Sequence, residues 1–336
     1  MSYWNGTDGN HRESWYWTGA AISLAFTIDL HLHPEAPNMA SSERKLRKRV
    51  WWSCFMRERL LSVENRRPTQ ICLEDSNLPM LEQSDFEIRP LPDGITVISR
   101  NCKAVRDASV RRQLAAICIA RIQLCICISR MQDAQRHSLN YLSPRREDKT
   151  RPHALTKNPA DSDEAFNRVD EELLAWSESL PNSCQFRTLT AADSQSGQSA
   201  IAVQRTFLHL LYHTTVSMLH RNQMVQSVSS HAVSSRQVQH MSKWRVREAT
   251  MHITRMASQL HQLRLELFLP STGVSVFLAA ATVHILEIKS SGLERRQRAL
   301  EGFTRCMKVL TDLSKLYPTA NESIQVMRNS GVEKLS

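Results

Sequence analysis

Thiol and imidazole side chains are the groups in this sequence best suited to bind a metal, so their spacing is the first question. A DNA-binding zinc cluster needs several thiolates at short Cys-x-x-Cys spacings. No two of the 8 cysteines are three positions apart. The closest grouping is Cys118, Cys125 and Cys127, in an apolar segment with helical periodicity. We therefore expect these three to be small hydrophobic core residues, and the cysteines of this chain to be reduced thiols.

A pair of histidines, His209 and His213, stands one helical turn apart in the segment HLLYH. Zinc hydrolases with this spacing place a glutamate directly after the first histidine to activate a water molecule. This chain has Leu210 at that position. We therefore expect hydrogen-bonded or partly exposed histidines and no metal site.

Sequence motifs for nucleophilic catalysis and phosphate binding are missing. The sequence contains no Gly-x-Ser-x-Gly, Gly-x-x-x-x-Gly-Lys or Gly-x-Gly-x-x-Gly pattern, and only 9 glycines in all. The adjacent acids Glu171-Glu172 and Glu74-Asp75 have no second acidic cluster placed opposite them, so we interpret them as solvated positions. The patterns predict no catalytic residue, no metal ligand and no cofactor-binding residue in this chain.

A basic run from Lys45 to Arg49 directly precedes Trp51 and Trp52. Such a run can act as a nuclear import signal or contact phosphates. Here it shares a predicted helix with the tryptophans, which we expect to be buried. The apolar stripe of that helix is predicted to contain Leu46, Val50, Cys54, Leu61, Trp51 and Phe55.

The charged side chains of this helix are expected on its other faces. We expect Lys45, Lys48, Arg49 and Arg59 to project there and the basic residues to pair with acids such as those in 74–87. The net charge of the whole chain is +10. Basic surplus gathers in residues 100–157 and 201–264, whereas 61–99 and 158–200 are net acidic, so these segments can cover one another.

Scarce glycine and the lack of two-residue alternation predict an all-α protein. We expect two helical halves packed together, residues 1–131 and 166–336, joined by a polar connecting loop at 132–165. A second polar loop is expected at 222–240. The longest nearly uncharged apolar run, 274–286, is too short for a membrane span, and no signal peptide is evident, so a soluble intracellular protein is expected. Helices are predicted at 13–30, 111–131, 166–180, 201–221, 242–269, 274–290 and 296–316, and a further helix is predicted to begin after the cap at Ser41-Ser42 and to end near the turn at 65–67.

Three phrases of this sequence together resemble one protein family. They are SWYWTGAAISLAFTIDLHLHPE, RKLRKRVWWSCFMRERLLSVENRRPTQI and EDSNLPMLEQSDFE, and the later phrases EELLAWSESLP, LHLLYHTTVSMLHR and FLAAATVHIL fit as well. The family is the fungal-specific transcription factor domain, the regulatory "middle homology" region of fungal binuclear zinc-cluster activators. The resemblance covers about residues 13 to 318.

The residues that carry the family motif are expected to have structural or regulatory roles: His31, Trp51, Trp52, Arg59, Arg67 and Pro68. Some positions depart from the family. Asp29 stands where the family commonly has the glycine of Gly-Leu-His, and Glu58 precedes Arg59 where the family has aspartate. Arg67 either replaces the glycine of Gly-Arg-Pro or shifts that turn by one residue, and arginine reaches a positive φ less easily than glycine.

The resemblance implies a large, irregular multi-helix regulatory domain of a nuclear transcription regulator for nutrient-use or secondary-metabolite genes, and not an enzyme. Its implied partners are a small-molecule inducer, transcriptional co-regulators and a second copy in a homodimer. Family members carry a zinc cluster ahead of this region, and zinc is expected only if such a module exists. Either the gene product is truncated, or the regulator reaches DNA indirectly.

Two other interpretations remain open at this stage. An all-helical enzyme or small-molecule-binding protein with an apolar internal pocket would use Cys118, His209 and His213, which lie in predicted buried helices. Convergent titratable side chains in one deep pocket would favour it. A fragment that competes with intact homologous regulators by binding their partners is the other interpretation.

Overall fold

A computed structural model describes residues 11–34, 39–92, 94–142, 159–195, 197–226, 233–290 and 292–329. Over these ranges the chain forms ten α-helices and no β-strand, which confirms the all-α prediction. The α-helices are α1 (His11–Thr27), α2 (Ser41–Asn65), α3 (Lys103–Arg106), α4 (Ala108–Leu142), α5 (Pro159–Glu178), α6 (Gln198–Gln226), α7 (Val233–Gln262), α8 (Thr272–Ser290), α9 (Leu293–Leu313) and α10 (Pro318–Asn329). Short 3₁₀ turns form η1 (Leu73–Asp75), η2 (Gln83–Phe86), η3 (Ala191–Ser194) and η5 (Glu266–Phe268).

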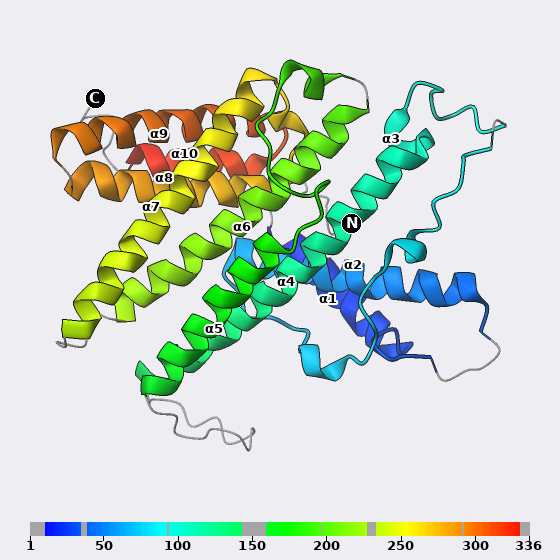
Figure 1. Cartoon of the computed structure of the whole chain (residues 1–336), viewed down its shortest axis with the longest axis horizontal. Helices are drawn as coiled ribbons and strands as arrows, with labels where there is room; N and C mark the ends of the chain where they lie inside the picture. Colours follow the sequence, from blue (N-terminus) through cyan, green and yellow to red (C-terminus); the bar gives the residue numbers. More distant parts are fainter. Residues whose placement is uncertain are drawn as a thin grey trace.

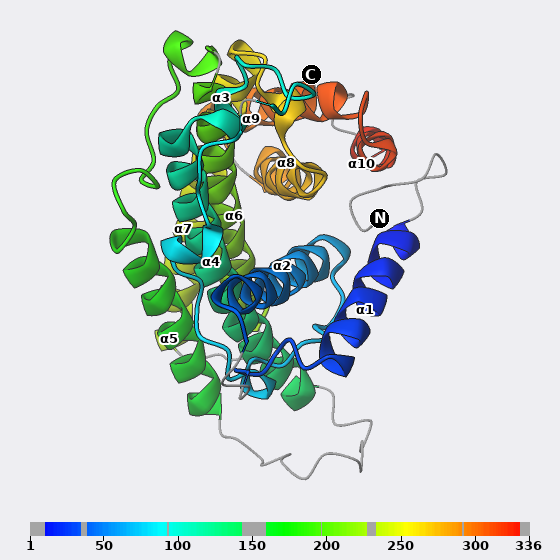
Figure 2. The same ribbon diagram turned by 90° about the vertical axis from the view of Figure 1, so that its right-hand side faces the viewer.

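Long helices form the body of the molecule, and shorter ones flank it (Figure 1). The helices α4, α5 and α6 pack against one another, and α6 packs most extensively against α7. The group α8, α9 and α10 packs on α6 and α7 at one end, while α2 packs against α4. Helix α1 lies at the edge of the molecule and packs against α2 (Figure 2).

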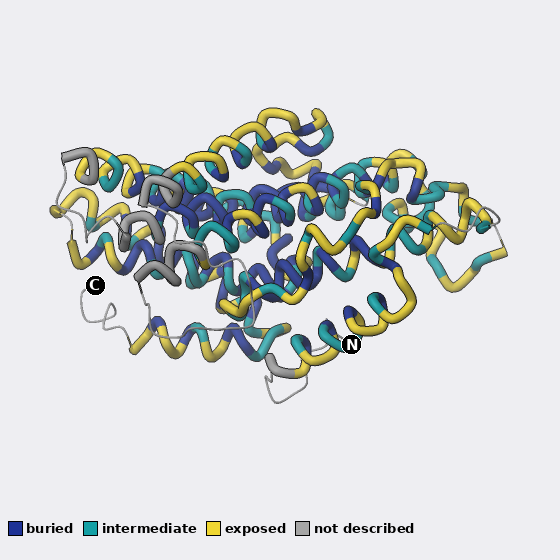
Figure 3. The backbone as a smooth tube through the Cα atoms, turned by 90° about the horizontal axis from the view of Figure 1, so that it is seen from below, coloured by how far each residue is buried: buried dark blue, intermediate teal, exposed yellow. Residues whose placement is uncertain are grey.

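The centre of the fold is a continuous hydrophobic core to which every described α-helix except α3 contributes. Figure 3 shows the buried segments gathered where the helices face one another. Helix α4 contributes Ile117, Ile122, Leu124 and Ile128, each at most 1% exposed, which confirms the prediction of a central buried helix. Both predicted halves supply side chains to this core. The division into two halves stays a prediction.

Two helices, α4 from Ala108 to Arg136 and α8, are long and apolar enough to cross a membrane by length and composition. The apolar run at 274–286, which is too short for a membrane span, is only part of α8. Both helices are packed into the core here: α8 contacts α9, α7 and α6, and α4 contacts α5 and α6. Burial on several sides accounts for their apolar composition.

The predicted polar loops were too long at both ends. Helix α4 continues to Leu142 and α5 begins at Pro159, inside the predicted connection 132–165. In the same way, α6 continues to Gln226 and α7 begins at Val233. Polar segments at helix ends carry no apolar period that would identify them as helical, and Pro159 at the first helical position favours a helix start. The rest of both loops, 143–158 and 227–232, lies outside the described residues.

Candidate regulatory site

The family-motif tryptophans lie on the buried face of α2. Trp51 is 1% exposed and Trp52 is 5% exposed, which confirms the prediction that both are interior. The Trp51 ring meets Phe26 edge-on, with centroids 5.5 Å apart, and lies 5.7 Å from the His31 ring. The indole N–H of Trp52 donates a hydrogen bond of 3.0 Å to the carbonyl of Pro79. Burial of the two rings stabilises the contact of α2 with its neighbours by several kcal/mol, at roughly 25 cal/mol per Å².

His31 joins the first two motif phrases. Its ring is half-buried and lies 4.6 Å from Phe26, so it completes an aromatic group with Trp51. Its carbonyl oxygen accepts a 2.8 Å hydrogen bond from Ser76. Residues 31, 51 and 76 are thereby brought together from three segments.

The basic run on α2 is used inside the fold. The Lys48 ammonium lies 2.7 Å from a carboxylate oxygen of Asp85, and Arg49 lies 3.1 Å from Glu87. These pairs confirm that acids within 74–87 receive basic side chains of α2. Arg47 donates to the carbonyls of Ile28 and Asp29, which follow the last turn of α1. Each of the three side chains therefore already serves an internal contact.

Arg59 is the main correction to the sequence analysis. It was expected on an outer face, but it is 1% exposed and lies at the centre of a buried polar network with Glu58, which is 0% exposed. One Nη of Arg59 is 2.5 Å from Glu58, and the other Nη donates to the carbonyl of Ile71. The Nε–H donates to Ser129 of α4. The guanidinium also lies 4.7 Å above the Phe55 ring.

Glu58 balances the charge of Arg59 in this network. Its other oxygen accepts a 2.8 Å hydrogen bond from the backbone N–H of Gln70. Burial raises the pKa of Glu58 and lowers the pKa of Arg59, and the ion pair opposes both shifts. The network ties α2, the segment after it and α4 together. Loss of either partner is costly, because it leaves the other as an unpaired buried charge.

The predicted apolar stripe of α2 was partly wrong. Leu46 is 52% exposed and Val50 is 40% exposed, although both were expected inside. The two tryptophans and Phe55, with much larger apolar surfaces, turn their own face to the core, which leaves the Leu46 and Val50 face outside. Val50 lines a shallow pocket together with Thr18 and Ala21 of α1.

The turn after α2 explains the departures from the family. Arg66, with φ 51°, is in the left-handed conformation, and the N–H of Arg67 donates to the carbonyl of Ser62 at 3.1 Å. The left-handed residue is thus Arg66, two positions before Pro68, where the glycine of Gly-Arg-Pro stands when the prolines are matched, so the turn is not shifted and Arg66 takes the place of the glycine. Asp29, which stands at a glycine position of the family, is also left-handed, with φ 53°. Aspartate adopts this conformation more readily than most residues.

Arg67 and Pro68 lie in the segment that leaves this turn. The Arg67 guanidinium lies 5.4 Å from the centre of the Trp15 ring, so the turn contacts α1. The Arg67 carbonyl accepts a 2.5 Å hydrogen bond from Ser62, which itself accepts one of 2.8 Å from Gln132 of α4. Pro68 lies outside helical structure. Ser129 and Gln132 were not predicted, since each stands 70 residues from its partner on α2 and no local motif marks it.

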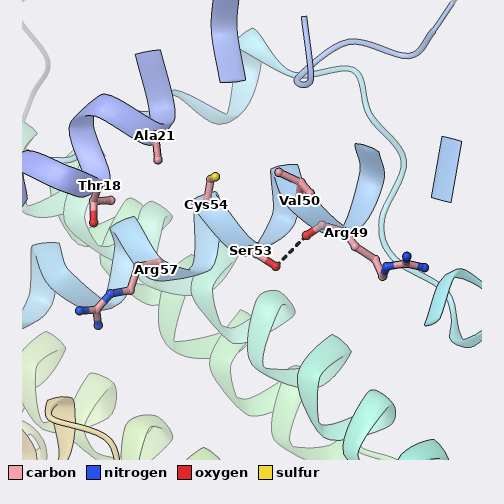
Figure 4. Close-up of a pocket in the computed structure, with 7 residues that line it drawn as sticks. All are labelled: Thr18, Ala21, Arg49, Val50, Ser53, Cys54 and Arg57. Atoms are coloured by element: carbon pink, nitrogen blue, oxygen red, sulfur yellow. Dashed lines mark hydrogen bonds between the residues drawn. The ribbon is translucent and has the colours of Figure 1, made fainter. Parts of the chain in front are cut away.

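A shallow pocket of about 300 Å³ lies between α1 and α2 (Figure 4). Seven described residues line it, and none of them is an acid or a histidine, so the pocket offers no general acid–base pair. Burial raises the pKa of the Cys54 thiol on its wall, which disfavours the reactive thiolate. The lining residues are Thr18, Ala21, Arg49, Val50, Ser53, Cys54 and Arg57.

The histidine pair on α6 has structural contacts. His209 shares a 2.9 Å hydrogen bond with the carbonyl of Cys184. His213 stacks on His252 of α7 with ring centroids 4.5 Å apart, and burial lowers its pKa to about 3. His209 is hydrogen-bonded and His213 is half-buried, in agreement with the prediction of hydrogen-bonded or partly exposed histidines.

The cysteines are free thiols, and the predicted core group is largely inside. Cys125 and Cys127 are buried, and burial raises the pKa of Cys125 to about 12 and that of Cys127 to about 11. Cys118 is half-buried and packs against the core. Thiols with such high pKa values are inert packing residues.

Known proteins similar to this chain are transcription factors. The fungal specific transcription factor domain matches residues 1–178. Cutinase transcription factor 1 beta of Fusarium vanettenii is 49% identical over 324 residues, which are 96% of this chain and 37% of that protein. A transcription factor of Fusarium pseudograminearum is 30% identical over 98% of this chain and 37% of its own length.

A more distant relative is transcription factor cpaR of Aspergillus oryzae, 27% identical over 93% of this chain and 52% of that protein. This chain spans about a third to a half of the length of these relatives. No solved structure matches it. The family and these relatives are named as transcription factors and not as enzymes. The chain belongs to the family of the fungal-specific transcription factor domain.

Proposed function

We propose that this chain is the regulatory domain of a fungal transcription factor that acts in the nucleus. The observation that carries the proposal is the 49% identity to cutinase transcription factor 1 beta over nearly the whole chain. That relative is named for a cutinase gene, so we propose that this chain controls genes for the use of a nutrient polymer of the cutin type. Cutin yields hydroxylated fatty acids, and these are the inducers to try first.

DNA is contacted through a separate module or through a partner protein, and not through the basic run of α2. Support comes from the internal contacts of that run: Arg47, Lys48 and Arg49 bind carbonyls or carboxylates of the same chain. Phosphate binding by these side chains would require those contacts to break. Any zinc used for DNA binding belongs to the separate module.

Regulation is proposed to work through a shift between two arrangements of the helices. An inducer or a co-regulator can cause such a shift only if it binds one arrangement more tightly than the other. The buried Glu58–Arg59 network supports this mechanism, because it holds α2 and α4 in one arrangement that a change of packing would break.

A reporter experiment tests this proposal. Residues 1–336 are fused to an unrelated DNA-binding domain, and reporter transcription is measured with and without hydroxylated fatty acids. We expect the fusion to raise or lower transcription relative to the DNA-binding domain alone, and the inducer to change that level. Equal transcription from the fusion and from the DNA-binding domain alone, under every condition, contradicts the proposal.

Co-purification distinguishes a homodimer from a monomeric domain that binds other proteins. A second, differently tagged copy of the chain should be recovered with the first if the domain forms a homodimer. Recovery of co-regulators without a second copy supports a monomeric domain that recruits other proteins.

A further inference from the structure

Three side chains that are far apart in the sequence meet where α7, η5 and α9 contact one another. His261 is at the C-terminal end of α7, Glu266 opens η5, and Asp312 is near the end of α9. The Nδ1 atom of His261 lies 3.3 Å from Oε1 of Glu266 and 3.2 Å from Oδ2 of Asp312. One donor atom from each residue lies within 4.8 Å of the other two.

The two separations from His261 match the spacing of zinc ligands. Zinc binds imidazole nitrogen and carboxylate oxygen at roughly 2.0–2.2 Å with tetrahedral geometry. Two ligands at such distances and angles stand about 3.3 Å apart. The nitrogen of His261 therefore already lies at the ligand spacing from both oxygens.

The charge balance of the cluster favours a cation. Two carboxylates surround one imidazole, and Glu266 is only 3% exposed. Its carboxylate points toward His261, and its second oxygen, Oε2, has no hydrogen-bond partner in the described structure. Lys315 lies 2.6 Å from Asp312 at the solvent side and neutralises part of that charge.

An open hollow of about 440 Å³ gives access to the cluster. His261 and Asp312 line it, together with Phe303, Met307 and the basic side chains of Lys308 and Arg328. An ion can therefore reach the donor atoms of His261 and Asp312 from solvent, and a water molecule has room to be the fourth ligand.

We propose that His261, Glu266 and Asp312 bind a divalent transition-metal ion of the zinc class, with water as the fourth ligand. The ion joins the end of α7 to α9 through the turn η5. This site lies in the C-terminal part of the chain, beyond residues 1–178 that match the family domain. It does not depend on the function proposed above, and it is separate from any zinc used for DNA binding.

Metal titration tests the site. Metal-free protein of residues 1–336 carrying Cys72→Ser, which removes an exposed thiol, is titrated with Zn²⁺ by calorimetry and with Co²⁺ by visible absorption. We expect one ion per chain, a rise in the thermal unfolding midpoint, and a Co²⁺ spectrum typical of tetrahedral coordination. Asp312→Asn and His261→Gln should each weaken the affinity at least about tenfold.

The matched control is His240→Gln, which changes an exposed histidine on the same helix, α7. Its affinity should equal that of the unmodified site. Far-UV circular dichroism and the unfolding midpoint without metal check that each variant folds. His261 and Asp312 are partly exposed, so their substitution is expected to preserve the fold.

Two results would overturn the proposal. One is the absence of Zn²⁺ and Co²⁺ binding at millimolar concentrations. The other is binding that Asp312→Asn and His261→Gln leave as strong as in the His240→Gln control, since the ion would then bind elsewhere.

Discussion

The Glu58–Arg59 pair of α2 and the His261–Glu266–Asp312 cluster both join segments far apart in the sequence, yet their charges are balanced differently. Arg59 faces one carboxylate and two neutral oxygen acceptors inside the core. The cluster places two carboxylates around one imidazole beside an open hollow. The polar atoms of the first network bond to one another and stabilise the fold. The second cluster has an excess of carboxylate oxygens that can bind a cation. Charge balance and access to solvent therefore separate a structural network from a binding site.

The largest effect is expected from Arg59→Met. The substitution leaves the buried carboxylate of Glu58 without its partner, and breaking a buried pair in this way costs about 3–5 kcal/mol. Urea unfolding followed by circular dichroism measures the loss. Arg298→Met is the matched control, since Arg298 forms an exposed ion pair with Glu294 and should change stability by less than about 1 kcal/mol. Equal losses in both variants contradict the assigned role of Arg59.

Replacement of both partners tests whether Glu58 and Arg59 act as a pair. Glu58→Met combined with Arg59→Met removes the charges together and keeps side chains of similar length. We expect the double variant to be about 1–3 kcal/mol more stable than Arg59→Met alone, because no unpaired charge remains. The double-mutant cycle in urea gives the coupling energy. Strictly additive losses would show that the two groups do not act as a pair.

His213 has no opposite charge beside it among the described residues, and its lowered pKa is expected to make the stability of the fold depend on pH. Its pKa is about 3 in the fold, lowered by burial and by His252, against an ordinary value near 6.5 in the unfolded chain. The unfolded chain therefore binds more protons below about pH 6.5, so stability falls as the pH falls toward 3. Between pH 6.5 and about pH 5 the loss should be about 1–2 kcal/mol.

The measurement for His213 is the pH dependence of the unfolding free energy. His213→Gln should flatten the slope over this range relative to the unmodified chain, while His240→Gln, an exposed control, should not. The same slope in all three proteins is the contradicting result.

A substitution in the turn that follows α2 is expected to stabilise the protein. Arg66 is left-handed at φ 51°, where a glycine has no steric cost. Arg66→Gly is expected to raise the unfolding free energy by about 1 kcal/mol. Arg67→Gly should bring no such gain, since Arg67 is not left-handed and its ring contact with Trp15 would be lost. Thermal unfolding midpoints of both variants decide between the two positions.

The smallest effect is expected from Asp312→Asn without metal. The change removes one of two close carboxylates and weakens the contact with Lys315, and these effects oppose each other. The unfolding free energy of the metal-free protein should change by less than about 1 kcal/mol. A loss of stability as large as that of Arg59→Met would show that the cluster stabilises the fold as the Glu58–Arg59 pair does. The proposed difference between the two sites would then be wrong.

The sequence was sufficient to predict helices with strong apolar periodicity and large aromatic anchors. Trp51 and Trp52 gave the buried face of α2, and the run around Ile122 gave the central helix. Helix α10 was missed, because its apolar residues are few and it opens with Pro318, which also marks loops.

The sequence alone did not indicate which charged side chains are buried. Arginine is usually exposed, so Arg59 was assigned to the surface, and its partner Ser129 comes from another helix. The cluster of His261 with Asp312 depends on how α7 packs against α9, and no local motif marks it. Three-dimensional packing decides both sites.

The central claim is that the buried Glu58–Arg59 network holds the helix arrangement on which regulation depends. The most direct test measures transcription when Arg59 is replaced. The fusion of residues 1–336 with an unrelated DNA-binding domain is compared with its Arg59→Met and Arg298→Met variants, at equal protein levels, on the same reporter. The account predicts that Arg298→Met keeps the transcriptional effect and its response to inducer, while Arg59→Met changes both. Identical reporter output from all three fusions would contradict it.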